Sequence, residues 1–158
     1  MKVAPGDAQY CSWIRDEFEI STNPARADLQ FVHHFLTNSY WAKGVPLETV
    51  RLSIQHSVCF GIYHGSQQVG FARVISDRAT FAYLADVFVI EFYRGRGLSK
   101  WLMECIKDHP HLQGLRRWAL ITRDAHGLYQ RFGFTPLANP DRWMEIHDTG
   151  VYQEPRGI

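Results

Sequence analysis

The spacing of hydrophobic positions changes along the chain from a helical period to that of strands. Before residue 57, apolar residues recur every three or four positions, which predicts two amphipathic helices. From Val58 on they follow strand patterns, and the tight turn at residues 64–66 predicts a hairpin. The predicted helices run from Asn23 to about Ser39 and from Pro46 to about His56, and the predicted strands are Val58–Tyr63, Gln68–Ile75 and Phe81–Val89.

Segments on either side of this region complete the predicted elements. After Val89 the apolar residues return to helical spacing, and Pro110 prevents that helix from continuing. Gly133 follows the next helical pattern and is typical of a helix end. The remaining predicted elements are a first strand Phe18–Ile20, a helix Leu98–Asp108, a strand Trp118–Thr122, a helix Ala125–Phe132, and two last strands near Phe134–Leu137 and Arg142–His147.

The resulting order is β-α-α-β-β-β-α-β-α-β-β, in which one strand, turn, helix and strand form a parallel crossover. It predicts an α/β fold, close to the α+β class, with a central mixed, mostly antiparallel sheet and helices on both faces. No repeat or low-complexity tract divides the sequence. Residues 1–158 are therefore expected to form a single domain.

Composition restricts the partners of this domain. Lys and Arg number 17 and Asp and Glu number 16, which leaves a net charge of +1. No long-range field therefore favours nucleic acid or an anionic membrane as a partner, and any anion site must be local.

Cysteine usage and hydropathy indicate a cytoplasmic protein. The three cysteines, Cys11, Cys59 and Cys105, are odd in number and form no CxxC pattern, which argues against a disulfide framework or a structural zinc site. Residues 1–10 lack the apolar core of a signal peptide, and no window approaches the roughly 20 apolar residues that span a bilayer. We expect a reducing compartment and no membrane.

A glycine-rich turn between the strand that ends at Val89 and the next helix has the composition of a phosphate cradle. Gly95 and Gly97 allow backbone angles that other residues avoid and a close approach to a ligand. The first N–H groups of the following helix and its dipole favour a di-anion such as a pyrophosphate. Arg94, Arg96 and Lys100 add positive charge at the same place, which an ordinary helix start does not need.

Two motifs in this part of the chain resemble those of the GNAT family of acyl-CoA N-acetyltransferases. The first is Arg94-Gly95-Arg96-Gly97-Leu98-Ser99, and the second is Ala125-His126-Gly127-Leu128-Tyr129-Gln130-Arg131-Phe132-Gly133-Phe134. The resemblance in element order extends from about Phe18 to His147. It implies acetyl-CoA as co-substrate, bound by Val87, Phe88, Val89, Arg94, Gly95, Arg96, Gly97, Leu98, Ser99 and Lys100.

The resemblance also implies a catalytic site. It places Tyr129 as the acid that protonates the departing thiolate; the alternative is that an aromatic beside Phe132 and Phe134 is a core residue. It implies an acceptor pocket near Tyr40, Trp41, Tyr83 and Asp86.

The general base is left open. Ala85 stands where several amine acetyltransferases carry a Glu. Asp86 interrupts an apolar strand, and it either makes a structural ion pair or acts as a catalytic residue that holds the amine or relays its proton. The alternative bases are His33, His34 and His126. No metal is expected, because the pair His109 and His111 flanks a proline without further ligands nearby.

These inferences predict direct transfer of an acetyl group to a primary amine of a small molecule in a ternary complex. One alternative is a non-catalytic acyl-CoA sensor. Another is an acetyltransferase that acts on a protein or an aminoacyl-tRNA, and the low net charge disfavours the tRNA. The sequence leaves open whether the chain forms a homodimer.

Overall fold

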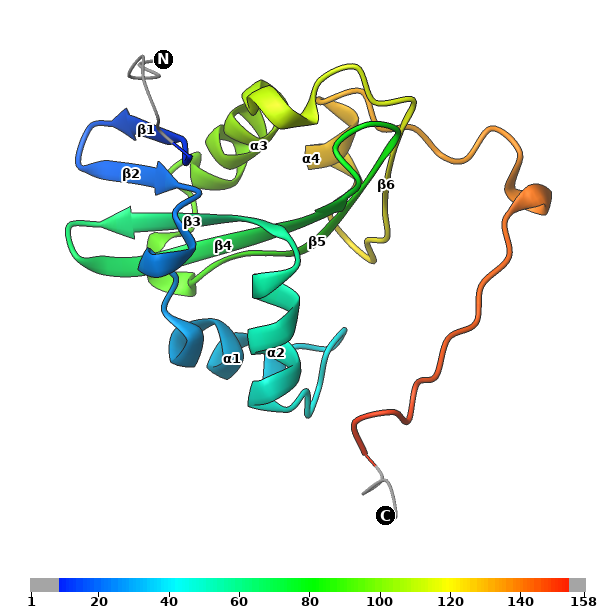
Figure 1. Cartoon of the computed structure of the whole chain (residues 1–158), viewed down its shortest axis with the longest axis horizontal. Helices are drawn as coiled ribbons and strands as arrows, with labels where there is room; N and C mark the ends of the chain where they lie inside the picture. Colours follow the sequence, from blue (N-terminus) through cyan, green and yellow to red (C-terminus); the bar gives the residue numbers. More distant parts are fainter. Residues whose placement is uncertain (1–8, 154–158) are drawn as a thin grey trace.

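In the computed structural model, which describes residues 9–153, six strands form one sheet in the order in which they occur in the chain (Figure 1). Neighbouring strands are antiparallel except for the fifth and sixth, which are parallel. The predicted mixed, mostly antiparallel sheet is confirmed. The strands are β1 (Ser12–Arg15), β2 (Phe18–Ser21), β3 (Val58–His64), β4 (Gln67–Ser76), β5 (Phe81–Val89) and β6 (Arg117–Leu120).

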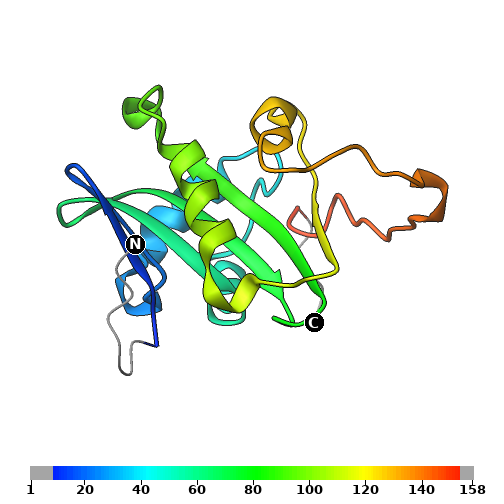
Figure 2. The ribbon, with the colours of Figure 1, turned by 90° about the horizontal axis from the view of Figure 1, so that it is seen from above.

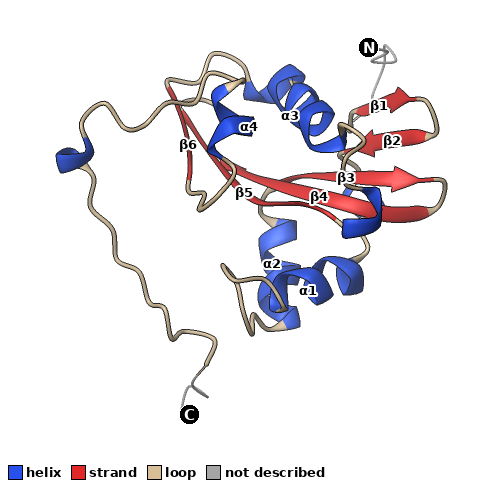
Figure 3. Ribbon diagram, turned by 180° about the vertical axis from the view of Figure 1, so that it is seen from behind, coloured by secondary structure: helices blue, strands red, loops and turns tan. Residues whose placement is uncertain are grey.

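Helices cover both faces of this sheet. The helices α1 (Leu29–Thr37) and α2 (Leu47–Gln55) lie on one face, and α3 (Leu98–Asp108) and α4 (His126–Gln130) lie on the other (Figure 3). Figure 2 shows α3 lying across the strands. Alternate strand residues point to opposite faces, so that Phe60 packs with α3 and Cys59 with α1 and α2. Within residues 9–153, no helix has the length and apolar character needed to cross a membrane.

A bulge changes the direction of side chains halfway along β5. Asp86 has a left-handed backbone with φ of 54°, and the pairing of β4 with β5 shifts register at this point. Leu84 before the bulge and Val89 after it both pack in the core beneath α3, although they lie an odd number of positions apart in the sequence. The bulge therefore re-aims the second half of β5, which leads into the glycine-rich turn.

Most predicted elements up to α4 are confirmed to within one or two residues, but two details before residue 40 differ. The sequence missed β1, because its side chains are mostly exposed and give no clear hydrophobic pattern. The helix predicted from Asn23 is divided: Asn23 caps only a 3-10 turn, Pro24–Arg26, and Asp28 caps α1 by accepting from the Phe31 N–H.

The prediction of two last strands, Phe134–Leu137 and Arg142–His147, is wrong. The Phe134 N–H donates back to the Tyr129 carbonyl, and prolines 136 and 140 have no N–H to give to a ladder. After α4 the chain leaves the sheet and runs outward in an extended path (Figure 1). The observed order is therefore β-β-α-α-β-β-β-α-β-α.

Candidate active site

The glycine-rich turn forms an open cradle at the N-terminus of α3. Gly95 and Gly97 have left-handed backbones, with φ of 76° and 77°. Apart from each glycine and its two chain neighbours, no atom of residues 9–153 lies within 4 Å of the point where a side chain would begin on Gly95 or Gly97. Gly97 caps α3 without a side-chain hydrogen bond, so the first N–H groups of the helix remain available. The cradle has the space and the donors that a pyrophosphate needs.

Basic side chains surround this cradle. The Arg94 Nε donates to the Val89 carbonyl at 2.9 Å, which ties the turn to the end of β5. The Arg96 guanidinium lies 5.1 Å from the centre of the Tyr93 ring, a cation–π distance. Lys100 is exposed on the first turn of α3. Their positive charges complement an anion in the cradle.

Because β5 and β6 pair over only part of β5, the second half of β5 has an unpaired backbone edge beside the cradle, which we call the slot. The last paired residues of the two strands are Leu84 and Leu120, where β6 ends, whereas β5 continues to Val89. In the described sheet, the β6 side of residues 85–89 has no neighbouring strand. An extended ligand with amide groups, as in pantetheine, can pair with the backbone there.

The apolar residues among the predicted cofactor residues, and Ser99, have buried or half-buried side chains. Phe88 and Leu98 are buried, and the Phe88 ring stacks on Phe35 with 3.8 Å between ring centres. Val87 packs against the core beneath α3, and Ser99 is half-buried at the start of that helix. At these positions the backbone, and not the apolar side chain, is what a ligand can use.

Trp41 and Asp86, which lie far apart in the sequence, meet on the acceptor side. The Trp41 Nε1 donates to Asp86 Oδ1 at 2.9 Å, and the Arg73 Nε donates to Asp86 Oδ2 at 2.8 Å. The side chains of Arg73 and Asp86 are only 16% and 10% exposed, so this ion pair is largely shielded from water. A carboxylate offers about four acceptor positions. Asp86 thus has both structural partners and remaining acceptor capacity.

Three tyrosines contribute to this region. Tyr40 packs edge to face against Trp41, with 5.1 Å between ring centres, and the Arg123 guanidinium lies 3.8 Å from the centre of the Tyr40 ring. Burial raises the pKa of Tyr83, and the negative charge of Asp86 acts in the same direction. Tyr129 lies on α4, and Tyr40 contributes to raising its pKa.

Tyr129 is the most enclosed of these tyrosines. It is 8% exposed and packs edge to face on Phe134, with 6.0 Å between ring centres. Burial raises the pKa of Tyr129 to about 12, with smaller contributions from Tyr40 and Asp124. The phenol is therefore protonated at neutral pH and can donate a proton or a hydrogen bond. A core aromatic residue would pack in the same way as Tyr129. This packing also holds the Tyr129 ring in one orientation.

Arg73 and Phe35 belong to the site, although the sequence did not single them out. Arg73 interrupts the apolar strand β4, just as Asp86 interrupts β5, and the two strands pair with Arg73 opposite Ala85. Each of the two consecutive apolar strands contains one charged residue in its interior, and the two charges are opposite. This pattern in the sequence could have revealed the ion pair. Nothing local in the sequence marks Phe35 as the partner of Phe88.

The histidines considered as bases have different surroundings. The His33 Nε2 lies 2.9 Å from the Val45 carbonyl and is therefore engaged in holding the loop after α1. His34 and His126 are exposed. None of them has a contact to Asp86 or Trp41 among the hydrogen bonds of the described residues.

The slot beside the second half of β5 and the cradle that follows it lie in a part of the chain that is similar to a known family. The model of the acetyltransferase (GNAT) domain family matches residues 55–136, which contain both the slot and the cradle. The chain belongs to the GNAT family. Membership confirms the resemblance seen in the two sequence motifs, and GNAT acetyltransferases use acetyl-CoA.

Relatives of this GNAT protein support acetyl transfer. A crystal structure from Xanthomonas campestris, assigned to the same family, is 50% identical, with a TM-score of 0.86 over 88% of this chain and 99% of that chain. A Gibberella zeae protein assigned as an acetyltransferase is 29% identical over 142 residues, covering 75% of this chain and 78% of that protein.

Similarity to a more distant structure supports the fold of this chain and nothing further. It is an acetyltransferase of Clostridium acetobutylicum crystallised with acetyl-CoA, 14% identical, with a TM-score of 0.55 over 77% of this chain and 92% of that chain.

Proposed function

We propose that this GNAT protein is a cytoplasmic single-domain N-acetyltransferase that moves an acetyl group from acetyl-CoA to a primary amine of a small molecule. The observation that carries the proposal is the adjacency of the slot beside residues 85–89 and the cradle at Gly95 and Gly97. The slot accepts an extended amide chain, and the cradle accepts a di-anion. Acetyl-CoA carries both groups, joined in that order.

The proposed chemistry is direct aminolysis in a ternary complex. The neutral amine attacks the thioester carbonyl carbon, a C–N bond forms, and the C–S bond breaks. The Tyr129 hydroxyl protonates the departing thiolate, while a backbone N–H near Val87 or Val89 stabilises the oxyanion. Burial of Cys59 and Cys105 and the raised pKa of both thiols, about 12, disfavour a covalent acyl-cysteine.

The aromatic residues Tyr40, Trp41 and Tyr83 are proposed to line the acceptor pocket beside Asp86. Aromatic faces bind an ammonium or an alkylamine, and their arrangement here is fixed by the hydrogen bond from Trp41 to Asp86. The low net charge of the chain gives no broad surface for tRNA, which favours a small acceptor.

Activity is tested by incubating the pure protein with acetyl-CoA and a panel of amines while free thiol is followed. We expect thiol release that depends on an added amine and equals the acetylated product found by mass spectrometry. Tight binding of acetyl-CoA without turnover on any amine would favour a sensor. In that case, labelled acetyl-CoA added to cell extract would reveal a protein or tRNA acceptor.

Asp86 is proposed to take part in catalysis through its remaining acceptor positions, by receiving the amine proton directly or through water. Asp86→Asn should lower kcat/KM for the amine by roughly 10-fold or more with acetyl-CoA affinity unchanged, because it removes the charge and keeps an acceptor for Trp41. Steady-state kinetics and calorimetry measure the two quantities.

Arg73→Gln is the matched control, since it breaks the same ion pair and leaves the carboxylate in place. Both variants should lose stability, by about 3 kcal/mol, because each leaves a shielded charge or dipole without its partner. An equal loss of kcat/KM in the two folded variants would show that Asp86 only maintains the structure.

A further inference from the structure

The loop that follows β6 carries an arginine to the acceptor side of the candidate site. Arg123 lies shortly after the end of β6, and its guanidinium is 3.8 Å from the centre of the Tyr40 ring. The Thr122 Oγ1 accepts from the Ala125 N–H at 3.0 Å, which fixes the turn that contains Arg123. The Tyr129 N–H donates to the Ala125 carbonyl, so this turn leads directly into the helix of the proposed catalytic acid.

The loop that carries Tyr40 is fixed by hydrogen bonds of its own. The buried Ser39 hydroxyl donates to the Leu36 carbonyl at 2.6 Å and accepts from the Ala42 N–H at 3.1 Å. Tyr40 and Trp41 follow Ser39 and pack edge to face. They remain 52% and 41% exposed, so a ligand can reach both rings.

These contacts place opposite charges at the two ends of the acceptor side. The Trp41 Nε1 donates to Asp86, and the Trp41 ring packs on Tyr40. Two aromatic side chains thus separate the Asp86 carboxylate from the Arg123 guanidinium, which is a separation on the order of 10 Å at the usual spacing of aromatic contacts. The Asp86 side chain is 10% exposed and that of Arg123 is 66% exposed. The negative end is therefore enclosed, and the positive end lies at the surface.

The Arg123 guanidinium has donors left for a ligand. Stacking on Tyr40 uses its face, whereas its N–H donors lie along the edge. Among the described residues its ion-pair partner is Asp124, with 4.0 Å between Nη2 and Oδ2, and an exposed pair at this distance is weak. The guanidinium edge matches the two oxygens of a carboxylate. The negative charge of Asp124 disfavours a doubly charged phosphate more than a singly charged carboxylate.

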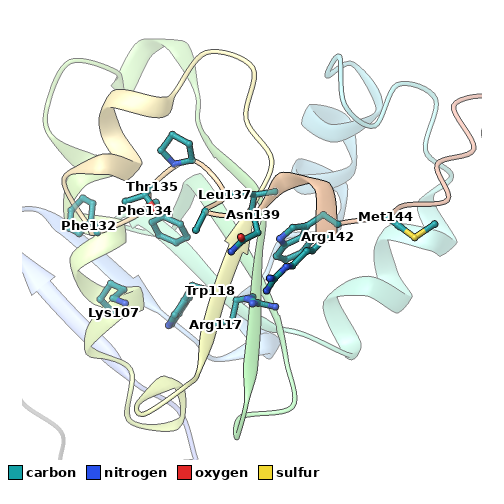
Figure 4. A pocket seen from close by; sticks show the side chains of 14 residues that line it. Lys107, Arg117, Trp118, Phe132, Phe134, Thr135, Leu137, Asn139, Arg142 and Met144 are labelled. Atoms are coloured by element: carbon teal, nitrogen blue, oxygen red, sulfur yellow. The ribbon is translucent and has the colours of Figure 1, made fainter.

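A second group of basic residues surrounds a hollow beside β6. The hollow has a volume of about 720 Å³ and lies between β6 and the outgoing segment, where Lys107, Arg117 and Arg142 line it (Figure 4). Of the described residues that line it, none belongs to the proposed acceptor pocket or takes part in the proposed chemistry. A carboxylate bound in this hollow would therefore not help to place an amine beside Asp86.

We propose that the amine acetylated by this protein carries a carboxylate, and that Arg123 is the residue that selects for it. The inference rests on the proposed function and names its class of acceptor, an amino acid whose amine and carboxylate lie several bonds apart. The amine lies near Asp86 and Tyr129, and the carboxylate pairs with Arg123 over the Tyr40 ring. In an α-amino acid the two groups are too close together to span this separation. Binding at both ends orients the amine toward the thioester.

The preference for acceptor charge tests the inference. The protein and acetyl-CoA are incubated with aminobutanoate, aminopentanoate and aminohexanoate, each with its amine on the terminal carbon, and with the matched neutral primary amides. Thiol release gives kcat/KM. We expect the parent to prefer the best acid over its amide by about 5-fold or more, Arg123→Gln to bring this ratio to within about twofold of one, and Arg123→Glu to favour the amide. Because Arg123 is exposed, both variants should keep the parent circular dichroism.

Arg117→Gln is the matched control. Arg117 also lies on an aromatic ring, 5.1 Å from the centre of Trp143, but it lines the hollow. This variant should keep the parent preference. Equal kcat/KM for acid and amide in the parent, a preference that survives in Arg123→Gln, or one that Arg117→Gln removes would overturn the inference, while acetylation of the amines would still support the proposed function. Thiol release with no amine at all would overturn both.

Discussion

Tyr129→Phe should lower the single-turnover rate of acetyl transfer by roughly 100-fold or more while leaving acetyl-CoA affinity nearly unchanged. The change keeps the ring and its contact with Phe134, so the loss reports the hydroxyl alone. Rapid mixing with a single turnover isolates the chemical step from product release.

Tyr63→Phe is the matched control for this experiment. Tyr63 is also buried, burial also raises its pKa to about 12, and it lies on β3, outside the candidate site. Its rate should stay within about threefold of the parent, a difference under 1 kcal/mol in the barrier. A single-turnover rate of Tyr129→Phe within that same range would show that Tyr129 has a purely structural role.

The pH dependence offers a second readout of Tyr129. Because its pKa is raised to about 12, the hydroxyl keeps its proton as the pH rises through the ordinary range of tyrosine, near 10. The single-turnover rate should therefore rise as the amine loses its proton and show no alkaline decline from Tyr129 below about pH 11. A decline centred near pH 10 that disappears in Tyr129→Phe would contradict the raised pKa.

Gly97→Glu should weaken acetyl-CoA binding by roughly 100-fold or more, as measured by calorimetry. The new side chain would enter the open space at the start of α3 and put a negative charge where the di-anion should lie. Binding by the parent should depend only modestly on salt, because directed N–H groups supply much of it.

The control for this change is Gly65→Glu in the turn between β3 and β4. Gly65 also has a left-handed backbone, φ of 60°, and open space around it. Both variants carry the same strain of about 1–2 kcal/mol from a side chain at positive φ. If the folded Gly97→Glu protein binds acetyl-CoA as tightly as Gly65→Glu does, the cradle is not the pyrophosphate site.

The sequence predicted well where one short stretch contains all the relevant signals. The apolar run that ends at Val89, the two glycines after it and the amphipathic pattern of α3 follow one another, so the strand, turn and helix could be placed together. The bulge at Asp86 was not predicted, because its φ depends on the register with β4. The same register brings Arg73 to Asp86.

The C-terminal strands show where a hydrophobic pattern alone is insufficient. Met144 and Ile146 have the alternation of a strand, but a strand exists only where another strand offers its N–H and carbonyl groups. The alternation of apolar residues indicates which side chains would need covering, but it does not supply the strand that would pair with them. For the same reason β1 escaped prediction: its pairing with β2 stabilises a segment with little apolar pattern.

Hydrogen–deuterium exchange with and without acetyl-CoA tests most directly whether the cofactor occupies the slot and the cradle. Binding should slow exchange at the amides of residues 85–100, where the second half of β5, the glycine-rich turn and the start of α3 meet, and should leave the β1–β2 hairpin at residues 12–21 unchanged. Acetyl-CoA that binds by calorimetry without protecting residues 85–100, or that protects the hollow beside β6 in their place, would contradict the account.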